Sequence, residues 1–187
     1  MRRLFIIHGY TGNPQKNWFP WLKTEAEKLG FIVAVPQMPN PFEPKLDEWL
    51  PALQKLVGDA DEDTYFACHS LGTATLLRFL QHLPDDQKIG GAVLAAAFAE
   101  KIPTFPELDN FVTGTWDDAK IKRSARKIAV LASNNDKHLP LTVCEHVRDR
   151  FNTDFTVLQN AGHINAAAGF TEAPVILDAL KKIAAIS

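Results

Sequence analysis

The chain has 187 residues, 46% of them hydrophobic, and a formal net charge of −2. This length and composition predict a single globular domain over residues 1–187 with a substantial core, and the charge gives no electrostatic reason to expect a nucleic-acid partner. The basic residues are scattered except for one cluster, which we interpret as a solvated helix face: Lys120, Lys122, Arg123, Arg126 and Lys127.

No stretch of the sequence has the form of a signal peptide or a membrane span. The apolar stretch at the amino terminus ends at Ile7 and is too short for a signal-peptide core, and the longest apolar run, residues 92–99, is too short to cross a bilayer. Cys68 and Cys144 lack the neighbours of a metal site or a redox pair, which fits a reducing compartment. We therefore expect a cytoplasmic protein without a membrane partner or a bound metal.

Short runs of branched and aromatic residues alternate with longer stretches of helical period, which is typical of a parallel sheet wrapped by helices. The predicted strands are residues 3–8, 31–35, 64–68, 91–97, 127–132 and 155–158. The predicted helices are residues 18–29, 46–57, 70–83, 141–151 and 172–186. Right-handed crossovers make the strands parallel and gather the loops that follow them at one edge of the sheet.

The loop after the first predicted strand reads His-Gly-Tyr-Thr-Gly over residues 8–12. A His-Gly pair at this place turns the chain tightly and directs a backbone N–H toward the edge where the loops gather. We predict that the N–H of Tyr10 or Thr11 is one donor to an oxyanion, the charged oxygen of a reaction intermediate. The alternative is a simple glycine turn, and His8 itself is interpreted as structural.

The third predicted strand runs through Cys-His-Ser-Leu-Gly, residues 68–72, directly into a helix. Such a turn holds a serine in a strained conformation with its hydroxyl exposed beside the first helical N–H groups. Ser70 is the predicted nucleophile, and the N–H of Leu71 is the other oxyanion donor. Cys68 replaces the first glycine of the usual Gly-x-Ser-x-Gly pattern, so we expect strain there without loss of activity. A serine that caps an ordinary helix is the alternative.

The loops after the fifth and sixth predicted strands supply an acid, Asp136, and a base, His163. A serine hydroxyl needs an imidazole to take its proton, and a carboxylate holds that imidazole in the required tautomer. The order Ser70, Asp136, His163 along the chain is the order found in α/β-hydrolases. The sequence therefore predicts a Ser-His-Asp triad.

Other titratable residues are weaker candidates for these roles. His138 is a rival base because it lies in the loop of Asp136, but we favour a pocket-lining or surface role. His69 is expected to pack beneath the nucleophile turn. The alternative acids lie in an irregular segment away from any strand end: Asp109, Asp117 and Asp118.

Five motifs together resemble one family. They are His-Gly-Tyr at 8–10, the aromatic run at 17–22, Cys-His-Ser-Leu-Gly at 68–72, Asn-Asp at 135–136 and Gly-His-Ile-Asn at 162–165. On these motifs the chain resembles, nearly end to end, the small α/β-hydrolases grouped with YdeN and retinoblastoma-binding protein 9. The resemblance implies an α/β-hydrolase fold with a six-stranded parallel sheet in the order 2-1-3-4-5-6, no large lid, and the triad at Ser70, Asp136 and His163.

A retinoblastoma partner does not follow from this resemblance. The short motif that binds the retinoblastoma pocket is Leu-x-Cys-x-Glu, and the chain does not contain it. Residues 141–145 hold these letters at the wrong spacing.

The segment 98–126, between the fourth and fifth predicted strands, is the insertion long enough to cover the site. Its length is short for a lipase-type lid, so we expect small or medium esters as substrates. We expect several side chains to line an apolar pocket for the acyl or alcohol group: Tyr10, Trp18, Phe98, Phe105, Phe111, Trp116, His138 and Leu139. For each aromatic residue the alternative is a place in the core.

The sequence predicts a serine hydrolase that works through an acyl-enzyme without a cofactor, most simply a carboxylesterase acting on a small-molecule ester or acyl substrate. A thioesterase or acyltransferase, and an amidase or peptidase, are alternatives because the same triad serves all of them. The alternative from another class is a protein-interaction module with little turnover. The natural substrate and the oligomeric state are not specified by these motifs.

Overall fold

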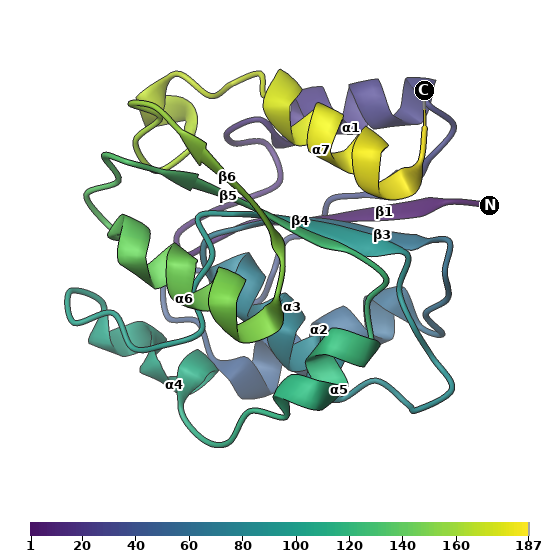
Figure 1. The fold of residues 1–187 in the computed structure, drawn as a ribbon, viewed down its shortest axis with the longest axis horizontal. Helices are drawn as coiled ribbons and strands as arrows, with labels where there is room; N and C mark the ends of the chain where they lie inside the picture. Colours follow the sequence, from purple (N-terminus) through teal and green to yellow (C-terminus); the bar gives the residue numbers. More distant parts are fainter. Residues whose placement is uncertain (187) are drawn as a thin grey trace.

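The computed structural model describes residues 1–186 and contains a six-stranded sheet between two layers of helices (Figure 1). The strands are β1 (Arg3–Ile7), β2 (Ile32–Ala34), β3 (Thr64–His69), β4 (Gly91–Ala95), β5 (Ile128–Ser133) and β6 (Asp154–Leu158). All neighbouring strands are parallel, in the order β2-β1-β3-β4-β5-β6. This topology confirms the predicted α/β-hydrolase fold and its strand order.

Helices cover both faces of the sheet. One face is covered by α1 (Phe19–Lys28) and α7 (Pro174–Ala184), which lie together above the sheet in Figure 1. The helices on the other side of the sheet are α2 (Leu46–Val57), α3 (Leu71–Gln81), α4 (Asp109–Val112), α5 (Asp118–Arg123) and α6 (Leu141–Phe151). Two short 3-10 helices, η1 (Pro106–Leu108) and η2 (Ala166–Ala168), complete the elements. None of the helices in residues 1–186 has the length and apolarity needed to traverse a bilayer.

Alternation along the strands divides the core into two halves. In β1, Phe5 and Ile7 pack on the side of α2 and α3, whereas Leu4 and Ile6 pack on the side of α1 and α7. Successive strand residues point to opposite faces, and a parallel sheet with helices on both faces buries both sets. This is why the inner strands are continuous apolar runs in the sequence.

Local signals mark the ends of several helices. Pro20 and Pro174 lie in the first turns of α1 and α7, where the missing N–H costs no hydrogen bond. Gly30, with φ of 84°, follows α1, and a left-handed residue at that place ends a helix. These signals account for the agreement between the predicted and observed helices, whose ends differ by at most two residues.

The segment 98–126 contains more regular structure than expected. It includes η1, α4 and α5, which are too short for a periodic pattern to reveal. Lys120 on α5 is buried, with 7% of its side chain exposed, and its Nζ lies 2.6 Å from Asp85 Oδ1. The interpretation of Lys120 as part of a solvated helix face is therefore wrong.

Arg78 on α3 attaches this segment to the rest of the protein. Its guanidinium donates to the carbonyl oxygens of Phe111 (2.9 Å), Thr113 (2.7 Å) and Thr115 (2.9 Å). It also lies 3.5 Å from the ring centre of Trp116, a favourable cation–π geometry. The segment is thus docked on α3 by a buried cation and does not form a large lid.

A glycine at the start of α3 sets how closely that helix approaches β1. A Cβ atom at Gly72 would lie 2.5 Å from the carbonyl oxygen of Ile7 and 2.8 Å from that of His8. Only glycine allows this approach. The contact places the residue at the turn before α3, Ser70, beside the loop that follows β1.

We expect Gly72→Ala to lower the free energy of unfolding by about 1–3 kcal/mol, because the added methyl group overpacks against backbone atoms that cannot move aside. Urea unfolding measures this loss. Gly30→Ala is a suitable comparison because a Cβ there meets no atom within 4 Å, so only its positive φ costs free energy, about 1 kcal/mol. Equal stability of Gly72→Ala and the wild type would contradict the argument.

Candidate functional site

Ser70 lies at the sharp turn between β3 and α3. Its φ of 52° and ψ of −118° lie in a region that residues other than glycine rarely adopt. The Ser70 N–H donates to the Ala95 carbonyl (2.9 Å), and the Ser70 carbonyl accepts from the N–H (2.8 Å) and hydroxyl (2.6 Å) of Thr73. Hydrogen bonds on both sides therefore hold the strained turn, and the half-buried Ser70 lines a pocket.

Cys68, two residues earlier, carries no comparable strain. It lies within β3, is fully buried in the same half of the core as Leu71 and Leu94, and is not among the residues with positive φ. Burial raises the pKa of its thiol well above the ordinary value. The backbone at Cys68 therefore lies outside the left-handed region, and the small thiol is accommodated as a core side chain.

Asp136 and His163 form a buried ion pair or hydrogen bond at the same edge of the sheet. Asp136 Oδ2 lies 2.7 Å from His163 Nδ1, and Oδ1 accepts from the N–H groups of His138 (2.8 Å) and Leu139 (3.1 Å). Burial opposes ionisation of the carboxyl group, but the hydrogen bonds from His163 and the two N–H groups outweigh it and lower the pKa of Asp136. An ionised Asp136 fixes the proton of a neutral His163 on Nδ1 and leaves Nε2 as an acceptor.

The imidazole of His163 is enclosed by two other histidine rings. Its ring centre lies 4.8 Å from that of His69 and 5.1 Å from that of His138, both edge to face. His138 reaches Asp136 only through its backbone N–H, so the ring on the carboxylate is that of His163 and not of the rival base. Within residues 1–186 no hydrogen bond joins Ser70 Oγ to His163, and such contacts often tighten only when substrate binds.

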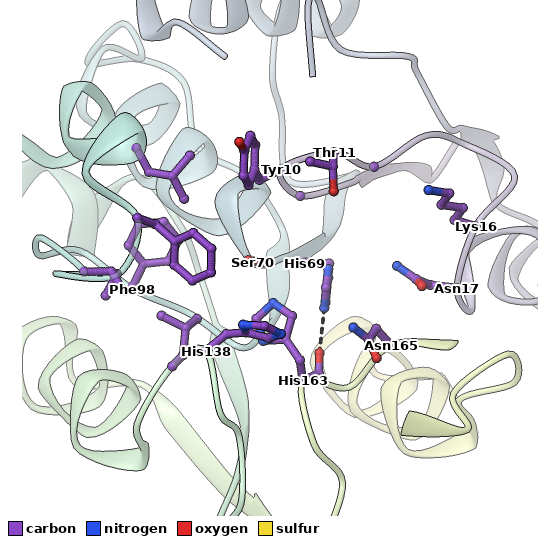
Figure 2. A pocket seen from close by; sticks show the side chains of 16 residues that line it. Tyr10, Thr11, Lys16, Asn17, His69, Ser70, Phe98, His138, His163 and Asn165 are labelled. Carbon is purple, nitrogen blue, oxygen red and sulfur yellow. Dashed lines mark hydrogen bonds between the residues drawn. The ribbon is translucent and has the colours of Figure 1, made fainter. Parts of the chain in front are cut away.

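His69 holds the backbone of the His163 loop through a hydrogen bond to a carbonyl oxygen. Its Nε2 lies 2.8 Å from the carbonyl oxygen of His163, the contact drawn as a dashed line in Figure 2. Burial lowers the pKa of His69 to about 3, with a further lowering by His163, so the ring is neutral and donates from Nε2. Trp18 Nε1 donates to the next carbonyl, that of Ile164, at 3.0 Å.

Asn135 and Ser133 fasten the acid loop to the loop that carries His163. Asn135 Oδ1 accepts from the hydroxyl of Ser133 and from the N–H of Gly162, each at 2.8 Å. Ser133 Oγ accepts in turn from the N–H of Ala161 at 3.1 Å. We did not identify these positioning residues from the sequence, although Asn135 precedes Asp136 in one of the motifs.

His8 orients the peptide group between Gly9 and Tyr10. Its Nε2 accepts from the N–H of Met38 (3.0 Å), so its proton is on Nδ1, which donates to the carbonyl of Gly9 (2.8 Å). The same carbonyl accepts from the N–H of Gly12 at 3.1 Å. Burial lowers the pKa of His8, and its structural interpretation is confirmed.

The orientation of this peptide determines where the Tyr10 N–H points. The carbonyl of Gly9 and the N–H of Tyr10 belong to one trans peptide and point in opposite directions, so anchoring the carbonyl aims the N–H away from His8. The N–H of Thr11 donates to the carbonyl of Pro41 at 2.8 Å. Thr11 is therefore not available as the oxyanion donor, which leaves Tyr10 of the two candidates.

Two free N–H groups flank the serine. Neither the N–H of Tyr10 nor that of Leu71 has an acceptor in the part of the chain that the structure describes. The loop lies directly against the turn, because a Cβ at Gly9 would lie 2.9 Å from Ser70 Cβ. One unpaired N–H therefore belongs to the first residue of α3 and the other to the loop packed against the Ser70 turn.

Ser70 and His163 line one pocket of about 330 Å³ (Figure 2). The apolar lining residues are Phe98, Ile102, Phe105, Leu108 and Leu139, and the rings of His138 and Tyr10 also line the pocket. The polar lining residues, on the other side of Ser70 in Figure 2, are Thr11, Lys16, Asn17 and Asn165. The pocket thus has an apolar lobe and a polar lobe with the serine between them.

Three of the aromatic residues that we expected in this pocket do not line it. Trp18 is fully buried and supports the His163 loop. Trp116 stacks on Arg78. Phe111 is fully buried, with its ring centre 5.5 Å from that of Trp49. These predictions are wrong because a tryptophan or phenylalanine in the core has the same sequence signal as one in a pocket.

The alternative acids lie outside the pocket and make local contacts. Asp109 pairs with Lys101 at 2.9 Å and Asp118 with Arg150 at 2.9 Å, while Asp117 caps α5. Nowhere in residues 1–186 do three or more His, Cys, Asp or Glu side chains group as metal ligands would.

The sequence and structure are similar to known hydrolases. Residues 4–182 match the family model described as serine hydrolase. The chain is 36% identical over 179 residues to the hydrolase YdeN of Bacillus subtilis (strain 168), covering 96% of this chain and 94% of YdeN. The crystal structure of the ydeN gene product of B. subtilis matches with a TM-score of 0.95 and covers 98% of each chain.

More distant structures share the fold. A YdeN-like hydrolase from Pectobacterium atrosepticum has a TM-score of 0.73 at 19% identity, covering 98% of this chain and 91% of its own. Est1E from Butyrivibrio proteoclasticus, with ferulic acid bound, has a TM-score of 0.72 at 14% identity, covering 98% and 90%. At these identities the likeness concerns the fold alone.

The buried neutral His69 predicts a loss of stability in acid. Its pKa is about 3 in the folded protein and about 6.5 when unfolded, so below pH 6.5 the unfolded chain binds a proton that the folded protein does not. This lowers the free energy of unfolding by about 2 kcal/mol at pH 5. His69→Gln keeps a donor toward His163 but cannot titrate. Chemical denaturation at pH 8 and pH 5 should therefore show a smaller decrease for the variant, and equal decreases would contradict the prediction.

The hydrogen bonds of Asn135 predict that it positions the His163 loop for catalysis. We expect Asn135→Ala to reduce kcat for an ester by about tenfold or more with little change in KM, because the His163 loop loses its anchor at Gly162. Asn135→Asp keeps an acceptor oxygen for both hydrogen bonds and should retain most of kcat. A purely structural role would instead make both variants equal in kcat at a temperature where both are folded.

Proposed function

We propose that this chain, which belongs to the serine hydrolase family, hydrolyses small or medium carboxylic esters through an acyl-enzyme formed on Ser70. The observation that carries the proposal is the 2.7 Å contact of Asp136 with His163, in the pocket that also holds the strained Ser70. A buried carboxylate paired with a histidine beside an accessible serine is the arrangement that activates a hydroxyl nucleophile.

In the proposed mechanism, His163 Nε2 takes the proton of Ser70 Oγ as that oxygen attacks the ester carbonyl carbon. The negative charge of Asp136 stabilises the imidazolium that forms. When the tetrahedral intermediate collapses, the C–O bond to the alcohol breaks and His163 gives its proton to the leaving oxygen. Water, deprotonated by His163, then attacks the acyl-enzyme and releases the acid, and Ser70 regains its proton.

The N–H groups of Tyr10 and Leu71 are the proposed oxyanion donors. Both lack another acceptor within residues 1–186. Leu71 directly follows Ser70 at the start of α3, and Tyr10 lies in the loop that packs against the Ser70 turn. Donors fixed before the reaction stabilise the developing charge without reorganisation. The role of His8 in this proposal is indirect, because it holds the Gly9 carbonyl and thereby the direction of the Tyr10 N–H.

The size of the pocket supports small or medium substrates. A volume of about 330 Å³ lies near the lower end of the range for small-molecule sites. Segment 98–126 contributes Phe98, Ile102, Phe105 and Leu108 to the apolar lobe. Because this segment is docked through Arg78, we expect it to line the pocket without opening as a lid.

We expect Ser70→Ala and His163→Ala each to lower kcat for 4-nitrophenyl butanoate by on the order of 10⁴-fold or more, because triad members act as a unit. Asp136→Asn should leave more residual activity than either. His146→Ala is the matched control, because His146 is exposed on α6 and outside the pocket.

Labelling by a fluorophosphonate probe tests the same nucleophile without an ester. The wild type should be labelled on Ser70, and Ser70→Ala should not. A wild type that neither hydrolyses esters nor reacts with the probe would overturn the proposed function in favour of a binding module.

A further inference from the structure

The polar lobe of the pocket presents three nitrogen groups to the space beside Ser70. They belong to Lys16, Asn17 and Asn165, and in Figure 2 all three nitrogens point toward the middle of the pocket. They come from two segments, the loop before α1 and the loop after β6, which lie next to each other because Asn17 Oδ1 accepts from the N–H of Ala166 at 3.0 Å.

Hydrogen bonds from backbone N–H groups determine which end of the Asn17 and Asn165 side-chain amides faces the pocket. Asn17 Oδ1 accepts from Ala166 N–H, and Asn165 Oδ1 accepts from Ala168 N–H at 3.1 Å. A backbone N–H cannot accept a hydrogen bond, so the oxygen of each amide must face it. The NH₂ group of each amide is therefore the end left for a ligand, and neither has an acceptor among residues 1–186.

Asn17 is also held in an unusual backbone conformation, with φ of 56°. Asparagine tolerates this region better than most residues, and here its side chain is tied to the neighbouring loop. The amide is thus fixed before any ligand arrives, which reduces the ordering cost of binding.

Lys16 adds a positive charge to this lobe. Its side chain is exposed at the rim, and within the described residues 1–186 no carboxylate lies within 4 Å of its Nζ. The pocket lining contains no aspartate or glutamate. Asp136 lies behind His163, with 2% of its side chain exposed, and is already hydrogen-bonded.

Resting on the proposed function, we propose that the polar lobe binds a carboxylate of the substrate, so that this enzyme's preferred esters carry a carboxylate on one side of the scissile bond and an apolar group on the other. A carboxylate is acceptor-only and matches a lobe that offers two amide NH₂ groups and one ammonium group. Hydrogen bonds to an ionised acceptor are stronger than those to a neutral one. The apolar lobe on the other side of Ser70 takes the remaining part of the substrate.

The test uses two pairs of nearly isosteric esters. In the first pair the leaving group differs: 4-carboxyphenyl butanoate against 4-carbamoylphenyl butanoate. In the second pair the acyl group differs: monomethyl adipate against methyl 5-carbamoylpentanoate. We expect the wild type to favour the carboxylate member of one pair by about tenfold in kcat/KM, and the pair that responds identifies the side of the ester that enters the polar lobe.

Variants of the three side chains should reduce or abolish this preference. Asn17→Asp and Asn165→Asp keep the acceptor for the backbone N–H but replace the NH₂ donors by a negative charge, so each should lower the carboxylate-to-amide ratio of kcat/KM by about tenfold or more. Lys16→Met should lower it by about fivefold. Lys55→Met is the matched control, because Lys55 is exposed on α2 and outside the pocket, and it should keep the wild-type ratio.

Binding to Ser70→Ala separates failure of this inference from failure of the proposed function. Calorimetric titration of Ser70→Ala with each aryl and methyl ester needs no turnover. Preferential binding of a carboxylate ester that is lost in Ser70→Ala/Lys16→Met supports the carboxylate lobe even if the wild type hydrolyses nothing. If the wild type hydrolyses esters but its carboxylate-to-amide ratio of kcat/KM equals that of Lys16→Met and of both Asn→Asp variants, the carboxylate-binding proposal is wrong. The hydrolase proposal would then still stand.

Discussion

The close contact between the start of α3 and the end of β1 determines the geometry of the whole site. Gly72 lies against the carbonyl oxygens of Ile7 and His8, and no larger residue fits there. This contact brings the strained Ser70 turn against the loop that follows β1. The pocket beside Ser70, and with it the proposed oxyanion donors, depends on this approach.

Three buried or half-buried histidines show how surroundings give one side chain different roles. His8 accepts from a backbone N–H and donates to a carbonyl, which makes it a fixed structural bridge. His69 is buried without a carboxylate, so its pKa is lowered to about 3 and it serves as a neutral donor to the His163 loop. Of these three, only His163 has a carboxylate on Nδ1, and it also lines the pocket; these two features suit it to be the proposed base.

The pocket combines an apolar lobe that segment 98–126 supplies with a polar lobe from the loops at Lys16, Asn17 and Asn165. Both lobes are held by hydrogen bonds within the protein: Arg78 secures the segment, and Asn17 secures the polar loops to each other. The site is therefore largely formed before substrate binds. Because its groups need little ordering on binding, a difference in substrate charge can change the rate directly.

The sequence alone determined the strands, the five long helices, the fold and the chain order of Ser70, Asp136 and His163, because alternation, helical period, glycine turns and short motifs are local signals. Only the tertiary structure decided that Trp18 and Trp116 support loops while Phe98 and Leu139 line the pocket, that Thr11 N–H is taken by Pro41 and that Lys120 is buried. It also brought Asn135 to Gly162 and Asn17 to Ala166. These facts depend on which distant groups meet in space, and the local sequence does not encode the partner of a side chain or of a backbone N–H.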